Sequence, residues 1–309
     1  MLDHINSTRH AAPDREKTHY IPVFYLKKWV GPDNKMCEFS RPYKEVKALR
    51  KHPNGTGYEP DLYAIDELPL DRRHMLERDF MKQVDQYASN VLKVLLADGQ
   101  LTFGLKEKVA WSRFILSLIQ RGPDRVAWLC KNFDHMRDNE LARLRNFRSS
   151  IGDVADLAAF DNFQKSIRPS AQAVEKALVI QAMINLPNVV ERITKMRWHV
   201  VHLKNSAYRL LTSDQPVVTS DGLQYANSYI LFPVSQTAIF VATNSSNTEL
   251  EIDRLIRSDR FVSTINGQIC IQAEKYVYDC DDTHLTFVEN RLGKSKKRGT
   301  RAHQGSFPL

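Results

Sequence analysis

The sequence predicts an α+β fold in which helices are segregated from a mainly antiparallel sheet. Between about residues 71 and 196, apolar residues recur at the helical spacing of three and four. Between about residues 197 and 245, short β-rich runs alternate with turn residues. A further β-rich stretch precedes the helical block. We therefore expect strands from the N- and C-terminal segments to pack against a central helical block, as a single interleaved domain over residues 19–292.

The N-terminal part is expected to begin with a flexible leader. Residues 1–18 are polar and lack the apolar segment of a signal peptide. Pro22 then opens a short helix over residues 23–30, whose aromatic side chains dock it onto the fold. A strand pair at 36–40 and 45–49 and a loop at 52–61 are expected next.

Consecutive helices are expected in the central block. The helix over residues 71–97 shows the clearest apolar periodicity. The helix over 104–120 is apolar on nearly every side, so we expect it at the centre of the fold. Gly122 and Pro123 end this helix. Further helices are expected at 123–149, which is rich in arginine, and at 153–165, 170–185 and 187–196.

The C-terminal part begins with β-rich runs at 197–203, 208–213, 216–220, 229–234 and 237–243. Helices are expected near 249–261 and 266–277, and a last strand at 285–290. The hairpin formed near residues 36–49 is expected to join this sheet.

Charge and composition limit the classes of function. The net charge is +8, and the tail at 293–309 holds five basic residues and no acidic one. We interpret this tail either as a disordered solvated end or as an electrostatic arm for RNA, DNA or an anionic surface. No apolar run reaches the roughly 18 residues of a membrane helix, so we expect a cytoplasmic protein. The cysteines are far apart and form no CxxC pair, which favours reduced thiols. The sequence does not predict the oligomeric state.

Motifs in chain order resemble one protein family. These motifs are HYIP with Tyr25 and Leu26, Glu77 in LERDF, QRGP with Arg125, TSDQPV at 212–217, FPVS at 232–235 and AEKYVY at 273–278. Together they resemble the uncharacterised family called domain of unknown function 4238. Thr18 stands where that family usually has a first histidine, and Gln215 replaces an asparagine. The resemblance implies candidate positions but no activity.

His19 and Glu77 are the first candidate residues. A histidine serves as a general acid, a general base or a metal ligand, and it equally serves to anchor a chain by bonding a backbone carbonyl. Glu77 falls beside the apolar stripe of its helix, near Val84 and Val91, where a carboxylate needs a partner or a shifted pKa. Both a structural salt bridge and acid–base or metal-binding duty remain open.

Arg121, Arg125 and Asp214 complete the candidate set. The two arginines bracket a helix–helix corner, where they are suited to grip a phosphate or carboxylate or to pair with Glu77 and Asp214. Asp214 lies between two strands in TSDQPV. It is expected either to cap its own turn or to point into a cleft with His19.

We expect this set to perform phosphodiester hydrolysis of RNA or DNA, with His19, Glu77 and Asp214 as catalytic residues and Arg121 and Arg125 as substrate-binding residues. Carboxylates of this kind hold Mg²⁺ or Mn²⁺ in many such enzymes. The alternative is a non-catalytic nucleic-acid-binding or interaction module that uses the arginine-rich helix and the basic tail. A buried ionic cluster without chemistry also fits the same residues.

Overall fold

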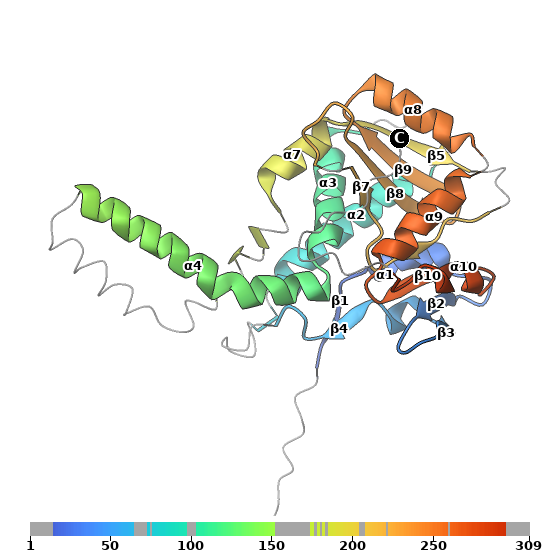
Figure 1. The fold of residues 1–309 in the computed structure, drawn as a ribbon, viewed down its shortest axis with the longest axis horizontal. Helices are drawn as coiled ribbons and strands as arrows, with labels where there is room; N and C mark the ends of the chain where they lie inside the picture. The colour runs from blue at the N-terminus through green and yellow to red at the C-terminus, as the bar shows by residue number, and fades with distance from the viewer. Residues whose placement is uncertain are drawn as a thin grey trace, which may run out of the picture.

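The β part of the fold consists, within the described residues, of two four-stranded antiparallel sheets and one two-stranded pair (Figure 1). The computed structural model describes residues 15–64, 73–74, 76–97, 103–151, 174–175, 178–179, 181–182, 185–203, 208–220, 222–258 and 260–294. One sheet has the order β3 (Lys47–Lys51), β2 (Met36–Ser40), β10 (Tyr276–Asp279), β6 (Thr212–Ser213). The other has the order β5 (Arg197–His202), β9 (Ala238–Thr243), β8 (Tyr229–Ser235), β7 (Val218–Thr219). The pair joins β1 (Lys17–His19) to β4 (Tyr58–Pro60).

The helices follow the predicted order, so the α+β class is confirmed. They are α1 (Val23–Leu26) with the 3₁₀ turn Lys27–Trp29, the 3₁₀ turn Pro53–Gly55, the π-helical turn η3 (Leu76–Met81), α2 (Lys82–Leu95), α3 (Leu105–Gln120), α4 (Pro123–Ile151), α7 (Pro187–Lys195), α8 (Ser246–Ile256), α9 (Phe261–Gln272) and α10 (Leu285–Glu289). None of the helices in the described ranges combines the length and the apolarity that crossing a membrane requires.

The N-terminal hairpin joins C-terminal strands, as expected. Strand β2 pairs with β10 along its length, with Phe39 opposite Val277. The expected single sheet is wrong, because the described strands form two separate four-stranded sheets.

Three local predictions are also wrong. The expected helix at 266–277 ends at Gln272, and strand β10 follows it. The expected strand at 285–290 is the helix α10. The loop at 52–61 contains β4, which pairs with a strand that begins inside the predicted leader. Each of these segments is short, so its conformation depends on pairing partners distant in sequence. The predicted helix at 153–165, residues 1–14 and the tail from 295 lie outside the described residues, as does most of the predicted helix at 170–185.

The sheet of β5, β9, β8 and β7 separates two hydrophobic cores. Side chains alternate across a strand, and in β8 Ile230 and Phe232 face the core formed with α2 and α3, where Trp111 lies. Leu231 faces the opposite core, which contains residues of α8 and α9. Because both faces are covered, β8 is apolar along nearly its whole length.

Aromatic residues of α1 and the turn after it fasten the start of the chain onto this architecture. The Tyr25 hydroxyl lies 2.6 Å from Thr212 Oγ1 and donates to the Pro233 carbonyl at 2.8 Å. The Trp29 indole donates to the Leu210 carbonyl at 2.9 Å. This part of the chain therefore contacts both four-stranded sheets, and the expected docking of the short helix is confirmed.

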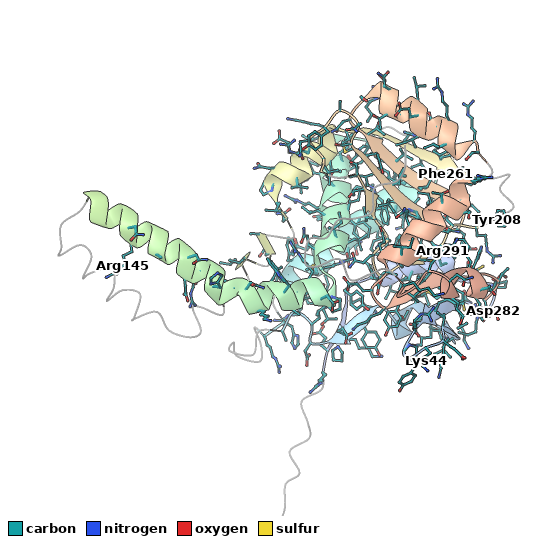
Figure 2. All side chains as sticks on the ribbon, viewed as in Figure 1. Lys44, Arg145, Tyr208, Phe261, Asp282 and Arg291 are labelled. Atoms are coloured by element: carbon teal, nitrogen blue, oxygen red, sulfur yellow. The ribbon has the colours of Figure 1, made fainter. Side chains whose placement is uncertain are left out.

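Helix α4 extends away from the body of the molecule (Figure 1). Its residue Arg145 lies far from the sheets in the side-chain view (Figure 2). The helix begins at Pro123, directly after the corner that carries the candidate arginines.

Candidate functional site

Arg121 is the most buried of the candidate residues. It follows the last residue of α3, and its side chain has no exposed surface. Its Nη1 donates to Asp85 Oδ1 at 2.8 Å, whereas its Nε and Nη2 are buried without a hydrogen-bond partner. Its backbone carbonyl accepts a bond from the Tyr63 hydroxyl at 2.8 Å. The corner thus places one guanidinium inside the fold with only part of its donor capacity used.

Glu77 lies in the π-helical turn that leads into α2. In a regular α-helix, eight positions would leave Glu77 and Asp85 about 80° apart around the axis, because one turn takes 3.6 residues. The π-helical turn absorbs one additional residue. The effective separation therefore becomes seven, which is close to two full turns. This shift aligns Glu77 with Asp85 more closely than with Val84, the neighbour expected from a regular helix.

The environment of Glu77 favours its protonated form. Burial raises the pKa of Glu77 to about 7, the Arg121 charge opposes this rise, and the Asp85 charge adds to it. Its Oε2 atom is buried without a hydrogen-bond partner. Burial also raises the pKa of Asp85, against the opposing effect of Arg121. Glu77 is therefore suited to donate a proton near neutral pH.

His19 is held at the end of β1, opposite Tyr58 of β4. The two ring centroids are 5.4 Å apart. Burial lowers the pKa of His19, a backbone hydrogen bond with Asn54 opposes this, and the charges of Lys17 and Arg121 lower it further. Its Nε2 is buried without a hydrogen-bond partner. A neutral imidazole with an uncommitted nitrogen results.

Asp214 is engaged by backbone groups. Its Oδ1 accepts a bond from the Glu274 amide at 2.9 Å, and its Oδ2 accepts bonds from the amides of Lys275 at 2.6 Å and Tyr276 at 3.0 Å. Burial raises the pKa of Asp214 to about 6, although these bonds oppose the rise. The carboxylate therefore ties the turn after β6 to the start of β10, and this geometry favours an anchoring role.

Arg125 does not share the buried environment of Arg121. Its Nε donates to Gln120 Oε1 at 2.8 Å, and its guanidinium stacks 4.9 Å from the ring centroid of Trp128. The two arginines of the corner therefore have separate surroundings, one inside the fold and one on the half-buried side of α4.

The structure thus groups His19 and Glu77 around Arg121, whose charge acts on each of them. Asp85 and Tyr63 belong to the same cluster and were not predicted. In the sequence, Asp85 is one of several acids in the same helical block. Its partnership with Arg121 depends on how α2 packs against α3.

The residues in place do not fit the expected Mg²⁺ or Mn²⁺. Across the described ranges, no group of three or more His, Cys, Asp or Glu side chains is arranged to hold a metal ion. The Asp214 oxygens accept backbone bonds, and the Asp85 carboxylate is bound by a guanidinium. A hard divalent cation requires several free oxygen ligands, so we derive no step that uses one.

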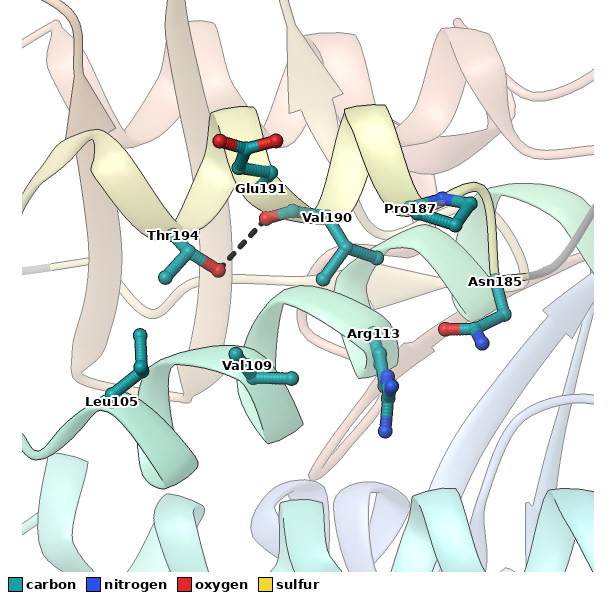
Figure 3. Close-up of a pocket in the computed structure, with 8 residues that line it drawn as sticks. All are labelled: Leu105, Val109, Arg113, Asn185, Pro187, Val190, Glu191 and Thr194. Carbon is teal, nitrogen blue, oxygen red and sulfur yellow. Dashed lines mark hydrogen bonds between the residues drawn. The ribbon is translucent and has the colours of Figure 1, made fainter.

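A surface hollow of about 320 Å³ lies between α3 and α7 (Figure 3). Among the residues that line it are Leu105, Val109 and Val190, together with the charged Arg113 and Glu191. None of the five predicted site residues contributes to this hollow. The hollow is therefore separate from His19 at the end of β1 and Glu77 in the π-helical turn.

Comparison with known proteins identifies the family of the chain. A match to an ATP-dependent lipid A-core flippase of Chromohalobacter salexigens is 28% identical over 113 residues, which cover 35% of this chain and 19% of that protein. No solved structure matches the chain. The family profile described as "Protein of unknown function (DUF4238)" matches residues 17–283, which include every motif that suggested the resemblance. The chain therefore belongs to this family of unknown function.

Proposed function

We propose that the protein is a hydrolase that cleaves phosphodiesters of RNA or DNA with His19, Glu77 and Arg121, without a metal ion. The observation that carries this proposal is that each of these three side chains has a buried polar atom without a partner. Leaving such an atom unpaired costs about 1–3 kcal/mol. A cluster of them therefore indicates a place for water or a polar ligand.

The three residues have complementary roles. His19, kept neutral by its lowered pKa, accepts a proton from the attacking water as the new P–O bond forms. Glu77, whose pKa is raised to about 7, donates its proton to the oxygen that leaves as the ester bond breaks. Arg121 compensates the negative charge on the phosphoryl group. General acid–base catalysis of this kind contributes about 10²–10⁴-fold each, and a preorganised cation adds to it.

The other two predicted residues support the site. Asp214 holds the turn that follows β6 in position. Arg125, stacked on Trp128, is placed to contact a flanking phosphate. Because Arg121 is fully buried, the substrate reaches the cluster only when the segments that cover it open locally.

The test is cleavage of labelled single-stranded RNA and DNA by the full-length protein in the presence of EDTA. His19→Ala and Glu77→Gln are each expected to reduce the rate by about 100-fold or more. The matched controls His52→Ala and Glu251→Gln, both at exposed positions, are expected to cleave at the wild-type rate. Cleavage that appears only when Mg²⁺ is added, or that survives both site substitutions, contradicts the proposal.

The second candidate is a nucleic-acid-binding module without catalysis. The projecting helix α4 favours it, because the Trp128 side chain is 37% exposed and the Arg125 guanidinium stacks on its ring. Exposed aromatic rings stack on bases, and nearby cations neutralise phosphates. This candidate predicts that Trp128→Ala weakens binding of an oligonucleotide, that binding falls steeply with salt, and that His19→Ala leaves binding unchanged. Binding with this pattern, without any cleavage, would favour the module over the enzyme.

A further inference from the structure

We infer that Asp85 is a positioning residue that makes Arg121 present one edge of its guanidinium to an oxyanion with two free oxygens, such as a phosphate group. The inference deepens the proposed function, because it assigns a ligand class to the same cluster. Its basis is which nitrogens of Arg121 are bound and which are free.

A guanidinium group offers its five N–H donors in a planar fork. Nε and Nη2 point in parallel along one side of this fork, and that side binds two oxygens of a carboxylate or phosphate at once. In this protein Asp85 takes Nη1, on the other side, through a 2.8 Å bond. The unpartnered nitrogens are Nε and Nη2. The free donors are thus the pair that binds a two-oxygen anion.

Two partly buried acids act on this arginine, and they behave differently. Asp85 bonds to it, whereas Glu77 acts on it only through its charge and keeps Oε2 unpartnered. A purely structural ion pair would gain most by using the two-nitrogen edge, because bidentate pairs are the stronger ones. Asp85 leaves that edge free. The bond from Arg121 Nη1 to Asp85 Oδ1 restrains the guanidinium from turning toward Glu77.

The same arrangement suits an incoming anion. A protonated Glu77 is a donor and does not repel a phosphate, whereas an ionised Glu77 would. The negative charge of Asp85 adds to the forces that keep Glu77 protonated. The negative charge of Asp85 also repels an incoming anion, which offsets this benefit. Asp85 therefore supports the anion site mainly by orienting Arg121.

The test is a calorimetric titration of the full-length protein with inorganic phosphate near pH 6.5. The wild type is expected to bind phosphate saturably. Asp85→Ala is expected to bind about tenfold more weakly or worse, because Arg121 loses its restraint. Asp85→Asn keeps an acceptor oxygen and is expected to bind at least as tightly as the wild type. Asp79→Ala, which removes an exposed acid from the same turn, is the matched control and is expected to bind like the wild type.

The sign of these changes separates positioning from simple charge. If Asp85 were only a nearby negative charge, both Asp85→Ala and Asp85→Asn would tighten phosphate binding, and that result overturns the inference. Arg121→Lys keeps the charge but has no two-nitrogen edge, and it is expected to lose about tenfold or more in affinity. Phosphate binding by Arg121→Lys at wild-type affinity overturns the inference even if Asp85→Ala fails to fold. Absence of saturable binding to the wild type overturns it as well.

Cleavage assays on the same variants distinguish this inference from the proposed function. Phosphate binding with the expected pattern, but no cleavage of RNA or DNA, leaves the inference standing and rejects the hydrolase. Cleavage by an Asp85→Ala protein with unchanged phosphate affinity rejects the inference and leaves the hydrolase standing.

Discussion

Asp214 and Tyr276 are joined in both directions. The Asp214 amide donates to the Tyr276 carbonyl at 3.1 Å, and the Tyr276 amide donates to Asp214 Oδ2 at 3.0 Å. Strand β6 has two residues, so its own ladder offers few bonds to hold it beside β10. The carboxylate extends this pairing beyond the end of the strand. The position of the turn that follows β6 therefore depends on Asp214, together with Gln272, whose side-chain amide donates to the Gln215 and Val217 carbonyls.

Asp214→Ala is expected to destabilise the protein by about 3 kcal/mol, because three part-buried hydrogen bonds from backbone amides lose their acceptor. Asp214→Asn is expected to cost about 1–3 kcal/mol, since its amide group places a donor against a donor. Urea denaturation at pH 7 measures both changes. Asp282→Asn, at an exposed position, serves as the control, and an Asp214→Asn protein as stable as this control would contradict the anchoring role.

Glu77→Gln is expected to stabilise the protein at pH 8 but not at pH 4. The folded-state pKa of Glu77 is raised to about 7 from a usual value of 4.5. The folded state therefore prefers the protonated form, and Glu77 costs stability progressively as pH rises from about 4.5 to about 7. Glutamine removes this cost because it carries no charge.

Urea denaturation of wild type and Glu77→Gln at the two pH values measures the difference. The exposed substitution Glu251→Gln is expected to change stability equally at both. A Glu77→Gln effect that does not depend on pH would mean that Glu77 titrates normally in the folded protein.

The rate of phosphodiester cleavage is expected to depend on pH as a narrow bell. The base His19 must be neutral, which holds above its lowered pKa, and the acid Glu77 must be protonated, which holds below about 7. Above pH 7, kcat/KM is therefore expected to fall by about tenfold for each further unit. A profile that rises through pH 8 would exclude Glu77 as the general acid.

Tyr25→Phe is expected to destabilise the protein by about 1–3 kcal/mol, because the Pro233 carbonyl and the Thr212 hydroxyl are buried and lose their shared partner. Thermal or urea unfolding measures the loss. Tyr87→Phe, whose side chain is 62% exposed, is the control. If both variants have the same free energy of unfolding, the Tyr25 hydroxyl does not hold the sheets together.

The sequence by itself determined the elements whose residues carry their own signal. The predicted helix at 104–120 is Leu105–Gln120, and the arginine-rich helix expected at 123–149 is Pro123–Ile151. Apolar periodicity, together with Gly122 and Pro123, is sufficient to locate these boundaries. The motifs around His19, Glu77 and Asp214 also identified the family. The types and the order of these residues can be read from the sequence without knowing the fold.

Only the tertiary structure decided how these residues are used. The carboxylate oxygens of Asp214 accept hydrogen bonds from backbone amides about 60 positions away. Every residue type except proline has such an amide, so the sequence does not indicate these partners. The alignment of Glu77 with Asp85 depends on a π-helical turn, whose extra residue shifts the helical phase without a distinctive composition. The choice of Asp85 as the partner of Arg121 depends on the packing of α2 against α3. Local patterns encode local structure, whereas burial, pairing and pKa depend on contacts between distant segments.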